Sequence, residues 1–500
     1  MSVFLGLDVG TSVTKAGLFD DAGRELGRAT RPTGVTHPQP GWSEADPELV
    51  WSAVTDLCRD MSALAARLRC EIAGVGVAGA MVGAWVVDGA GQPLRPAILW
   101  DDTRTQALID DAAIAQPGFM TRIFASSGSV MQQGCTLPLL RWLLDGEPDT
   151  MRSAAAVFGS KDFVRFRLTG TMATDGTEAA VAPGSAEARS RSAAMLSMFD
   201  LSDHSHLLPV VRPSASLAGT VTANAAAATG LAVGTPVAIG AGDVPANIIG
   251  GGELTPGARM TVLGTTCLNG VLCEAPSFEP RDLGLLFTIP GGLWLRTMVN
   301  VSGTTALDWC VAALCPDLAG EGVFDRLEKL ATTVSPGSDG LTFLPYLSPA
   351  GIIAPQVEPA ARGGFAGLTT DHGRAHLVRA VYEGVMFAVA SCYDLMGNVR
   401  TPIRLLGGGS RSRFWCQMLA DITQSPVLIP EGMEFGARGA ALLAATATGR
   451  YGTINEAVAA TPLPVRRHEP DPGRSAAYAA ARTRYDRASR AHIEHIARRG

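Results

Sequence analysis

Residues 5–19 read Leu-Gly-Leu-Asp-Val-Gly-Thr-Ser-Val-Thr-Lys-Ala-Gly-Leu-Phe, two apolar runs joined by a polar turn. The pattern predicts a β-hairpin that opens a domain. Glycine lets a backbone approach phosphate oxygens, hydroxyl groups donate hydrogen bonds to them, and a single carboxylate suits hydrated Mg²⁺. The turn is therefore typical of a phosphate-binding loop, with an ordinary hairpin as the alternative. The candidate phosphate- and metal-binding residues of this segment are Asp8, Gly10, Thr11, Ser12 and Lys15.

A similar order of elements begins again in the second half of the chain. Residues 259–263 form a strand-like run that leads into Gly264-Thr265-Thr266. Residues 404–406 lead into Gly407-Gly408-Gly409-Ser410 and then into helical spacing over 414–422. A strand, a glycine turn and a helix N-terminus aim backbone N–H groups at a nucleotide. Because one nucleotide needs contacts from several turns, this recurrence argues against an ordinary hairpin.

Length and composition favour a globular protein with two or more domains. The chain has 500 residues, of which 47% are hydrophobic and 18% charged, and a single core stops growing at roughly 250–300 residues. Helical spacing over 47–69, strand character over 72–77 and a buried strand over 236–240 follow one another, which is the α/β pattern. Asp243 comes directly after the last strand, and we place the domain division there, giving domains of residues 1–245 and 246–500.

Several classes of protein are disfavoured. The net charge is −6, and no basic run interleaved with aromatic residues offers a surface for nucleic acid. The nine cysteines are scattered without a CxxC pair or a zinc spacing, so we expect reduced thiols and no structural metal. The N-terminus lacks the features of a signal peptide, and no stretch suits a membrane span. The sequence predicts a cytoplasmic protein.

Residues 74–79 match the dinucleotide-binding pattern G-x-G-x-x-G. That fingerprint must open a helix, whereas here the match lies in a strand-like run that leads to another strand near 84–87. Close backbone packing explains these glycines better, and no Walker A motif is present. The C-terminal stretch 474–500 is expected to be a solvated helix.

The ordered motifs resemble those of the FGGY carbohydrate kinases, the family of xylulose, ribulose, erythritol and glycerol kinases. Besides the turns above, Gly41–Pro47, Trp100–Arg104, Ala241–Asp243 and Gly363–Leu368 carry the resemblance, which runs from residue 5 to about 450 and is strongest to the xylulose kinases. It implies an α/β fold of two ribonuclease H-like domains of the actin/hexokinase/Hsp70 type. ATP and a sugar would bind in the cleft between them.

The resemblance also implies the roles of individual residues in ATP-dependent sugar phosphorylation. Asp243 would be the general base and Asp8 the second catalytic carboxylate, both at Mg²⁺. A helix N-cap or turn aspartate is the alternative for Asp243. The residues implied for ATP are Gly10, Thr11, Ser12, Lys15, Gly264, Thr265, Gly303, Gly408, Gly409 and Arg413. Those implied for the sugar are Met81, Trp100, Asp102, Arg104 and Asp243, with a structural salt bridge as the alternative for Asp102 and Arg104.

A ketopentose such as D-xylulose is the leading substrate. The chain has Ala80-Met81-Val82-Gly83 where the xylulose kinases carry Gln-Met-His-Gly, so the pocket near Met81 is expected to be less polar. Erythritol, ribulose and L-xylulose remain alternatives. An actin-like ATP-driven chaperone or filament protein, and a non-catalytic actin-like ATP-binding sugar sensor, are alternatives of another class. The resemblance leaves a homodimer open.

Overall fold

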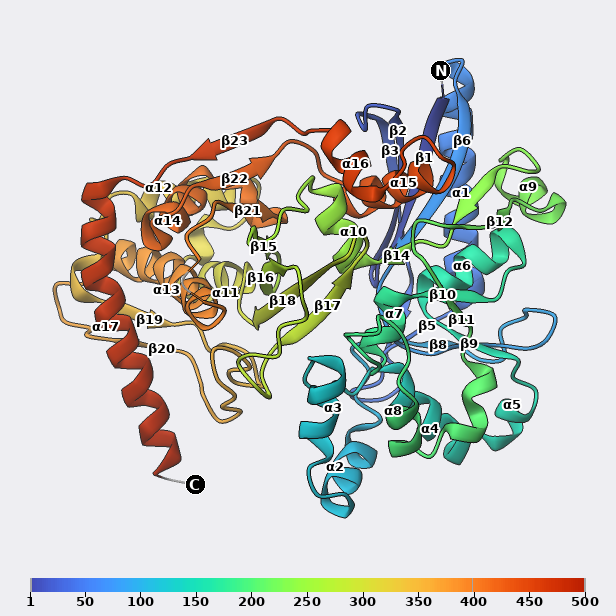
Figure 1. Cartoon of the computed structure of the whole chain (residues 1–500). Coiled ribbons are helices and arrows are strands. Elements are labelled where there is room, and N and C mark those ends of the chain that lie inside the picture. The colour runs from blue at the N-terminus through green and yellow to red at the C-terminus, as the bar shows by residue number, and fades with distance from the viewer. Residues whose placement is uncertain (1, 398, 499–500) are drawn as a thin grey trace.

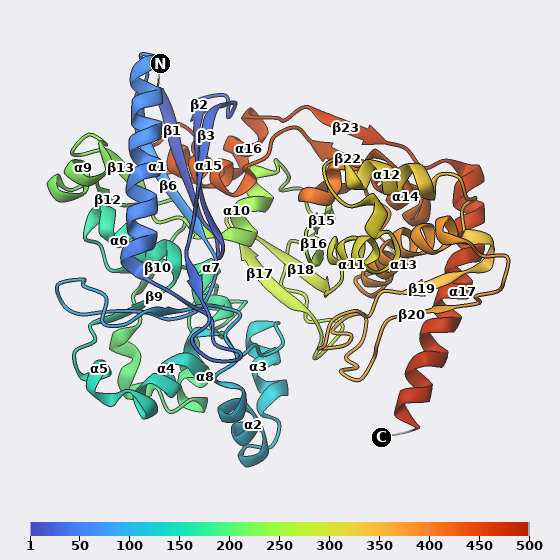
Figure 2. The ribbon, with the colours of Figure 1, turned by 180° about the vertical axis from the view of Figure 1, so that it is seen from behind.

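The computed structural model describes residues 2–397 and 399–498. Two lobes form the molecule, each built on a mixed β-sheet with helices on its faces (Figure 1). The first lobe contains the N-terminus, and the second carries the long C-terminal helix at its outer end, as the view from behind also shows (Figure 2). The predicted two-domain α/β architecture is confirmed.

The first sheet has seven strands in the order β12-β13-β6-β1-β2-β3, with β14 also paired to β6. β1 is antiparallel to β2 and parallel to β6, so the predicted hairpin is confirmed. The G-x-G-x-x-G stretch lies within β6 and not at the start of a helix. The strands are β1 (Ser2–Val9), β2 (Val13–Asp20), β3 (Glu25–Pro32), β6 (Glu71–Gly79), β12 (Leu217–Thr220), β13 (Pro236–Ala238) and β14 (Ala241–Gly242).

The second sheet repeats this arrangement, in the order β17-β18-β16-β15-β21-β22-β23. β18, β16 and β15 form an antiparallel meander like β3, β2 and β1, and β21 is parallel to β15 as β6 is to β1. The predicted recurrence is therefore confirmed. The strands are β15 (Arg259–Leu263), β16 (Cys267–Cys273), β17 (Leu285–Ile289), β18 (Leu293–Asn300), β21 (Ile403–Leu406), β22 (Val427–Pro430) and β23 (Val465–His468).

The alternation of side chains along β1 decides what each face of the first sheet contacts. Val3, Leu5 and Leu7 belong to a core shared with helices α1 (Pro47–Arg67) and α6 (Ser160–Thr169). Phe4, Gly6 and Asp8 face helix α15 (Phe435–Ala447), which comes from the second half of the chain. A β-carbon on Gly6 would lie 1.8 Å from the carbonyl oxygen of Ala437, so only glycine allows this approach.

Helices α10 (Asp243–Gly250) and α15 pack against each other at the junction of the lobes. A β-carbon on Gly250 would lie 1.8 Å from the Phe435 carbonyl oxygen, and one on Gly439 would lie 2.0 Å from that of Ala246. α10 ends the first half, yet Ile248 packs in the core beneath the second sheet. The predicted division at residue 245 falls inside this helix.

The other face of the second sheet is covered by α11 (Thr305–Leu314), α12 (Val323–Ala331), α13 (Arg374–Leu395) and α14 (Arg413–Thr423). Helix α17 (Pro472–Ala497) packs on α14 and on strand β19 (Thr342–Leu344). The expectation of a solvated C-terminal helix was wrong in part, because Tyr478 and Tyr485 are 2% exposed. Tyr478 accepts a hydrogen bond from Arg379 at 2.7 Å. The two tyrosines are seven residues apart, and both rings lie against Phe387 of α13.

The remaining elements form the small additions to each lobe. In the first lobe they are β4 (Val35–Thr36), β5 (Glu44–Ala45), β7 (Trp85–Val87), β8 (Ala97–Ile98), β9 (Ala156–Phe158), β10 (Ala173–Asp175), β11 (Val210–Arg212), α2 (Gln106–Ala115), α3 (Phe119–Ser127), α4 (Thr136–Gly146), α5 (Pro148–Arg152), α7 (Gly176–Val181), α8 (Ala193–Met198), η1 (Ser202–Leu207) and α9 (Ala223–Thr229). In the second they are η2 (Pro316–Leu318), η3 (Ser338–Gly340), β19 (Thr342–Leu344), β20 (Gly364–Ala366), η4 (Gly408–Arg411) and α16 (Ile454–Ala460).

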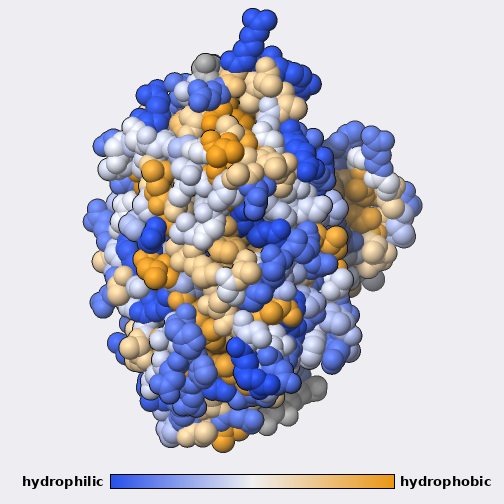
Figure 3. Space-filling model, turned by 90° about the vertical axis from the view of Figure 1, so that its right-hand side faces the viewer, coloured by the Kyte–Doolittle hydropathy of each residue, from blue (hydrophilic) through white to orange (hydrophobic). Residues whose placement is uncertain are grey.

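The surface and the cysteines agree with the composition. On the face in Figure 3, apolar side chains gather in small groups separated by polar ones. All nine cysteines are free thiols, seven of them buried, as predicted. Among the residues that the structure describes, no helix has the length and hydrophobicity needed to cross a bilayer.

Candidate active site

Two carboxylates meet at one edge of the first sheet. Asp8 of β1 and Ala241 of β14 both pair with Ala78 of β6, one from each side. Asp243 follows β14 directly and is the first residue of α10, so its carboxylate starts from the same edge as that of Asp8. Its Oδ1 accepts a hydrogen bond from the Val244 N–H at 2.7 Å.

The electrostatics of both carboxylates are unusual. Burial, together with the nearby charge of Asp8, raises the pKa of Asp243 to about 7. Burial raises the pKa of Asp8 to about 6, while Lys15 acts in the opposite direction. The Oδ1 atom of Asp8 is buried and has no hydrogen-bond partner. A carboxylate oxygen of this kind is suited to a cation, and Mg²⁺ binds through one or two carboxylates together with phosphate oxygens.

Glu434 is a candidate that the sequence interpretation missed. Its Oε2 lies 3.1 Å from the Nζ of Lys15, and its charge contributes to raising the pKa of Asp8. It is the N-cap residue of α15, the helix that follows β22, just as Asp243 begins the helix that follows β14. The repeated order of strands therefore supplied a signal: an acidic residue after the corresponding strand of the second half.

The turn between β1 and β2 contacts the segment predicted to hold the sugar. The Nε1 of Trp100 donates a hydrogen bond to the Oγ1 of Thr11 at 2.9 Å, and the Trp100 side chain is 46% exposed. The carbonyl of Gly10 accepts from the Thr33 hydroxyl at 2.9 Å, and Ser12 is exposed. The predicted phosphate and sugar segments thus touch through a tryptophan.

The glycine turns of the second lobe lie together at the ends of β15 and β21. Gly303 N donates to the carbonyl of Thr265 at 2.9 Å, and a β-carbon on Gly303 would lie 2.2 Å from the Gly264 carbonyl oxygen. A β-carbon on Gly409 would lie 2.4 Å from Leu263, the last residue of β15. Gly408 and Arg413 follow at the exposed side of this turn.

Met81 lies against Gly242, the residue that precedes Asp243. Met81 is 7% exposed, and a β-carbon on Gly242 would lie 2.4 Å from its Cγ. Val82 has a φ of 59°, a left-handed conformation that a β-branched residue adopts only under constraint. Its N–H donates to the Oε1 of Glu178 at 2.6 Å.

Asp102 and Arg104 lie in a buried ion network. The two oxygens of Asp102 accept four hydrogen bonds, three from Arg104 and one from the Ser43 N–H at 2.7 Å. Arg104 also donates to Glu44 at 2.8 Å and stacks on the Trp42 ring at 3.7 Å. In this geometry Asp102 is satisfied by protein groups, and a contact with sugar stays a prediction. The Nη1 of Arg104 is buried without a partner.

Comparison with known proteins gives full-length matches. Family models described as the FGGY family of carbohydrate kinases match residues 3–250 (N-terminal domain) and 260–448 (C-terminal domain). Xylulose kinase of Escherichia coli (strain K12) is 34% identical over 495 residues, covering 97% of this chain and 98% of that protein. Erythritol kinase of Brucella abortus (strain 2308) is 30% identical, covering 95% and 94%. The crystal structure of xylulose kinase from Rhodospirillum rubrum has a TM-score of 0.87 at 28% identity and covers 97% of both chains.

Proposed function

Because the chain belongs to the FGGY family of carbohydrate kinases, we propose that it transfers the terminal phosphate of ATP to a ketopentose, D-xylulose first of all, with Asp243 as the base. The pair of buried carboxylates at adjacent strand ends carries this proposal. Asp243 has a pKa raised to about 7, which suits a group that must take a proton near neutral pH. Kinases of this family use ATP as the phosphate donor.

Phosphoryl transfer asks the protein for positioning and for a proton acceptor. The carboxylate of Asp243 would accept the proton of the sugar hydroxyl while that oxygen attacks the terminal phosphorus and the bond to the leaving diphosphate breaks. Lys15 and the backbone N–H groups of the glycine turns would hold the phosphates. Trp100, which touches Thr11, would keep the sugar and the phosphate loop in register.

Asp8 and Asp243 would hold Mg²⁺, and the unpartnered Oδ1 of Asp8 supports this assignment. When bound, the ion would neutralise charge on the phosphates. Glu434 would hold the ammonium group of Lys15 in place through their ion pair. No three His, Cys, Asp or Glu residues lie close enough, within the described ranges, to hold a metal by protein ligands alone.

The substrate follows from relatives and from the pocket. The relatives reported above act, by their names, on xylulose and erythritol. Ala80 and Val82 bring no side-chain hydrogen bond to the pocket beside Met81, which favours a substrate with fewer hydroxyl contacts there. Erythritol, ribulose and L-xylulose remain the competitors to D-xylulose.

A coupled assay of ADP release with a panel of ketoses and polyols tests the proposal. We expect turnover of at least one sugar, and a loss of several orders of magnitude in Asp243→Asn, which keeps the shape of the side chain. Asp203→Asn, at an exposed aspartate remote in sequence from both catalytic segments, is the matched control. Turnover above about a tenth of wild type in Asp243→Asn removes this residue from the mechanism. Sugar binding without a phosphorylated product would indicate a sensor.

Two further proposals concern the cell and the assembly. The nine free thiols support a reducing compartment, and we place the enzyme in the cytoplasm. A homodimer is the assembly we test first, by light scattering of the purified protein at several concentrations. A constant monomer mass would exclude it over that concentration range.

A further inference from the structure

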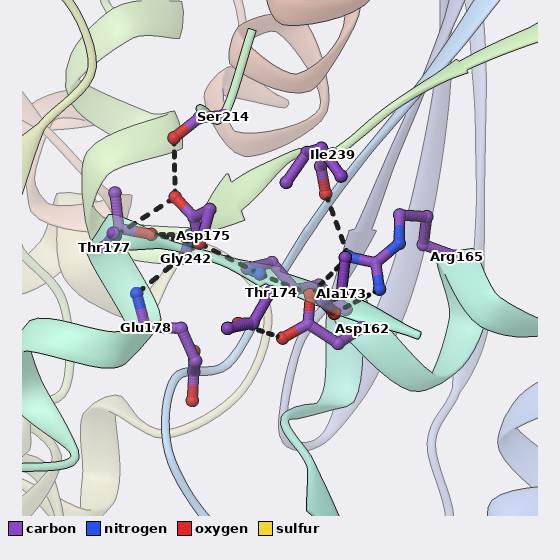
Figure 4. A network of polar contacts seen from close by, with 12 residues as sticks. Asp162, Arg165, Ala173, Thr174, Asp175, Thr177, Glu178, Ser214, Ile239 and Gly242 are labelled. Atoms are coloured by element: carbon purple, nitrogen blue, oxygen red, sulfur yellow. Dashed lines mark hydrogen bonds and ion pairs between the residues drawn. The ribbon is translucent and has the colours of Figure 1, made fainter. Parts of the chain in front are cut away.

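A cluster of buried charged residues includes Asp162, Arg165 and Asp175, which Figure 4 shows together with Thr177 and Gly242. Lys161, Asp162 and Arg165 of α6 and Asp175 at the end of β10 are 0% exposed. Lys161 lies 2.6 Å from Asp162 and 3.0 Å from Asp175, and Arg165 lies 2.6 Å from Asp162. Burying four charges is costly unless every one is paired. We therefore ask which neighbouring segments these buried charges position.

Asp175 binds the two residues that hydrogen-bond to the segment just before Asp243. Asp175 accepts the Thr177 hydroxyl at 2.9 Å and the Ser214 hydroxyl at 2.6 Å. In turn, the Oγ1 of Thr177 accepts the N–H of Gly242 at 2.8 Å. The carbonyl of Ser214 accepts the N–H of Gly240 at 3.0 Å. Both ends of the segment 240–242 are thus tied to Asp175 through one intervening residue.

This segment has little freedom to choose another path. Gly240 has a φ of 86°, and a β-carbon there would lie 2.0 Å from the Val77 carbonyl oxygen. Gly242 packs on Met81. Because Asp243 is the next residue, the hydrogen bond between Gly242 and Thr177 restrains the backbone from which its carboxylate extends.

The neighbouring residue of α7 holds the second segment. Glu178 is 6% exposed, and its Oε1 accepts the N–H of Val82 at 2.6 Å. Val82 has a left-handed backbone conformation, which a valine keeps only when a neighbouring group holds it there. The hydrogen bond to Glu178 is such a contact. Burial, above all, raises the pKa of the Glu178 carboxyl to about 8. A neutral carboxyl still presents a carbonyl oxygen to the Val82 N–H, so charge is not required for this contact.

We propose that Thr177 and Glu178 are positioning residues for the reaction. Thr177 sets the backbone that presents Asp243, and Glu178 sets the backbone that presents Met81 and Val82 to the sugar. The inference rests on the proposed function, in which Asp243 takes the proton and the segment 80–83 lines the sugar pocket. Because the two residues are adjacent on α7, a single short helix aligns the base with the substrate. A misplacement of about 1 Å at such a site lowers the rate roughly 10²-fold.

Two variants test the role of Thr177. Thr177→Val removes the acceptor for Gly242 N–H and keeps the shape, whereas Thr177→Ser keeps the hydroxyl. We expect kcat to fall about tenfold or more in Thr177→Val, with the KM for ATP nearly unchanged, and to be restored in Thr177→Ser. Thr174→Val is the matched control: Thr174 is 3% exposed and donates to Asp162 at 2.5 Å, and no hydrogen bond joins it to residues 240–243. It should lower the Tm by a similar amount while kcat stays near wild type.

Glu178 is tested through the KM of the sugar. Glu178→Gln keeps an amide oxygen for the Val82 N–H, and Glu178→Leu removes it. We expect the sugar KM to rise about tenfold in Glu178→Leu, with a smaller change in kcat, and to stay near wild type in Glu178→Gln.

Two results would overturn the inference. Equal loss of kcat in Thr177→Val and Thr174→Val at equal loss of Tm would make Thr177 merely structural, as would failure of Thr177→Ser to restore kcat. An unchanged sugar KM in folded Glu178→Leu would remove Glu178 from the pocket. Failure of the proposed function is a separate result, because wild type itself would then turn over no sugar, or Asp243→Asn would stay active.

Discussion

Gly250→Ala tests whether the contact between α10 and α15 sets the geometry of the site. The added β-carbon would lie 1.8 Å from the carbonyl oxygen of Phe435, and ordinary van der Waals contact begins at 3.4 Å, so the helices must separate by about 1.6 Å. The obstacle is backbone on both sides, so no side chain can rotate away. Overpacking of this kind typically costs about 1–3 kcal/mol, occasionally more.

Separating α10 from α15 would also move residues of the candidate active site. α10 begins with Asp243, and Glu434, which precedes Phe435, pairs with Lys15. A shift above 1 Å in either helix should therefore lower kcat by about two orders of magnitude, since such misplacements cost roughly 10²-fold. The measurements are the Tm by differential scanning fluorimetry and kcat in the coupled ADP assay. Gly89→Ala is the control, because nothing lies within 4 Å of a β-carbon at that position. If Gly250→Ala matches Gly89→Ala in Tm and kcat, the helix contact does not set the site.

Three further predictions concern the buried charges. Arg104→Met leaves the carboxylates of Asp102 and Glu44 without their shared cation. The free energy of unfolding, measured by urea titration, should fall by about 3–5 kcal/mol. An unchanged urea midpoint would contradict a structural role for this network. The pKa of Glu178 is raised to about 8 from 4.5, so the folded state loses stability as the pH rises through that window. The Tm advantage of Glu178→Gln over wild type should therefore widen up to pH 8 and then level off, whereas a constant difference would mean that Glu178 does not titrate there. Burial raises the pKa of Asp243 to about 7, and a base acts in its ionised form, so kcat/KM should rise with pH and level off above pH 7. If kcat/KM instead levels off above about pH 4, a group other than Asp243 controls the pH profile.

Local pattern was enough to predict the elements that position the site. The apolar run before Asp8, the glycine turn after it and the helical spacing over 47–69 each appear where their residue types favour them, as β1, the β1–β2 turn and α1. Glycine spacing within 74–79 was also informative, because β6 passes so close to α15 that a β-carbon on Gly76 would lie 1.8 Å from the Ala440 carbonyl oxygen.

Long-range contacts were beyond that reasoning. Nothing local to Thr177 predicts that its hydroxyl accepts a hydrogen bond from Gly242, 65 positions away. Arg104 was interpreted as part of the sugar pocket, but its stacking on Trp42 and its contact with Glu44 depend on how β5 and β8 pair. Such contacts are decided by tertiary packing, which a periodicity within one segment does not encode.

The repeated architecture also places two similar carboxylates in different electrostatic surroundings. In each half an acidic residue stands where the chain leaves the inner strands of the sheet and starts a helix at the junction, Asp243 before α10 and Glu434 before α15. Glu434 lies 3.1 Å from the Nζ of Lys15, so a cation stands directly beside this carboxylate. Within the part of the chain that the structure describes, Asp243 forms no salt bridge, and burial beside Asp8 favours its protonated form. The duplicated scaffold therefore supplies an acidic side chain twice, one beside a cation and one beside a second carboxylate, and our proposal assigns the role of base to the one without the cation.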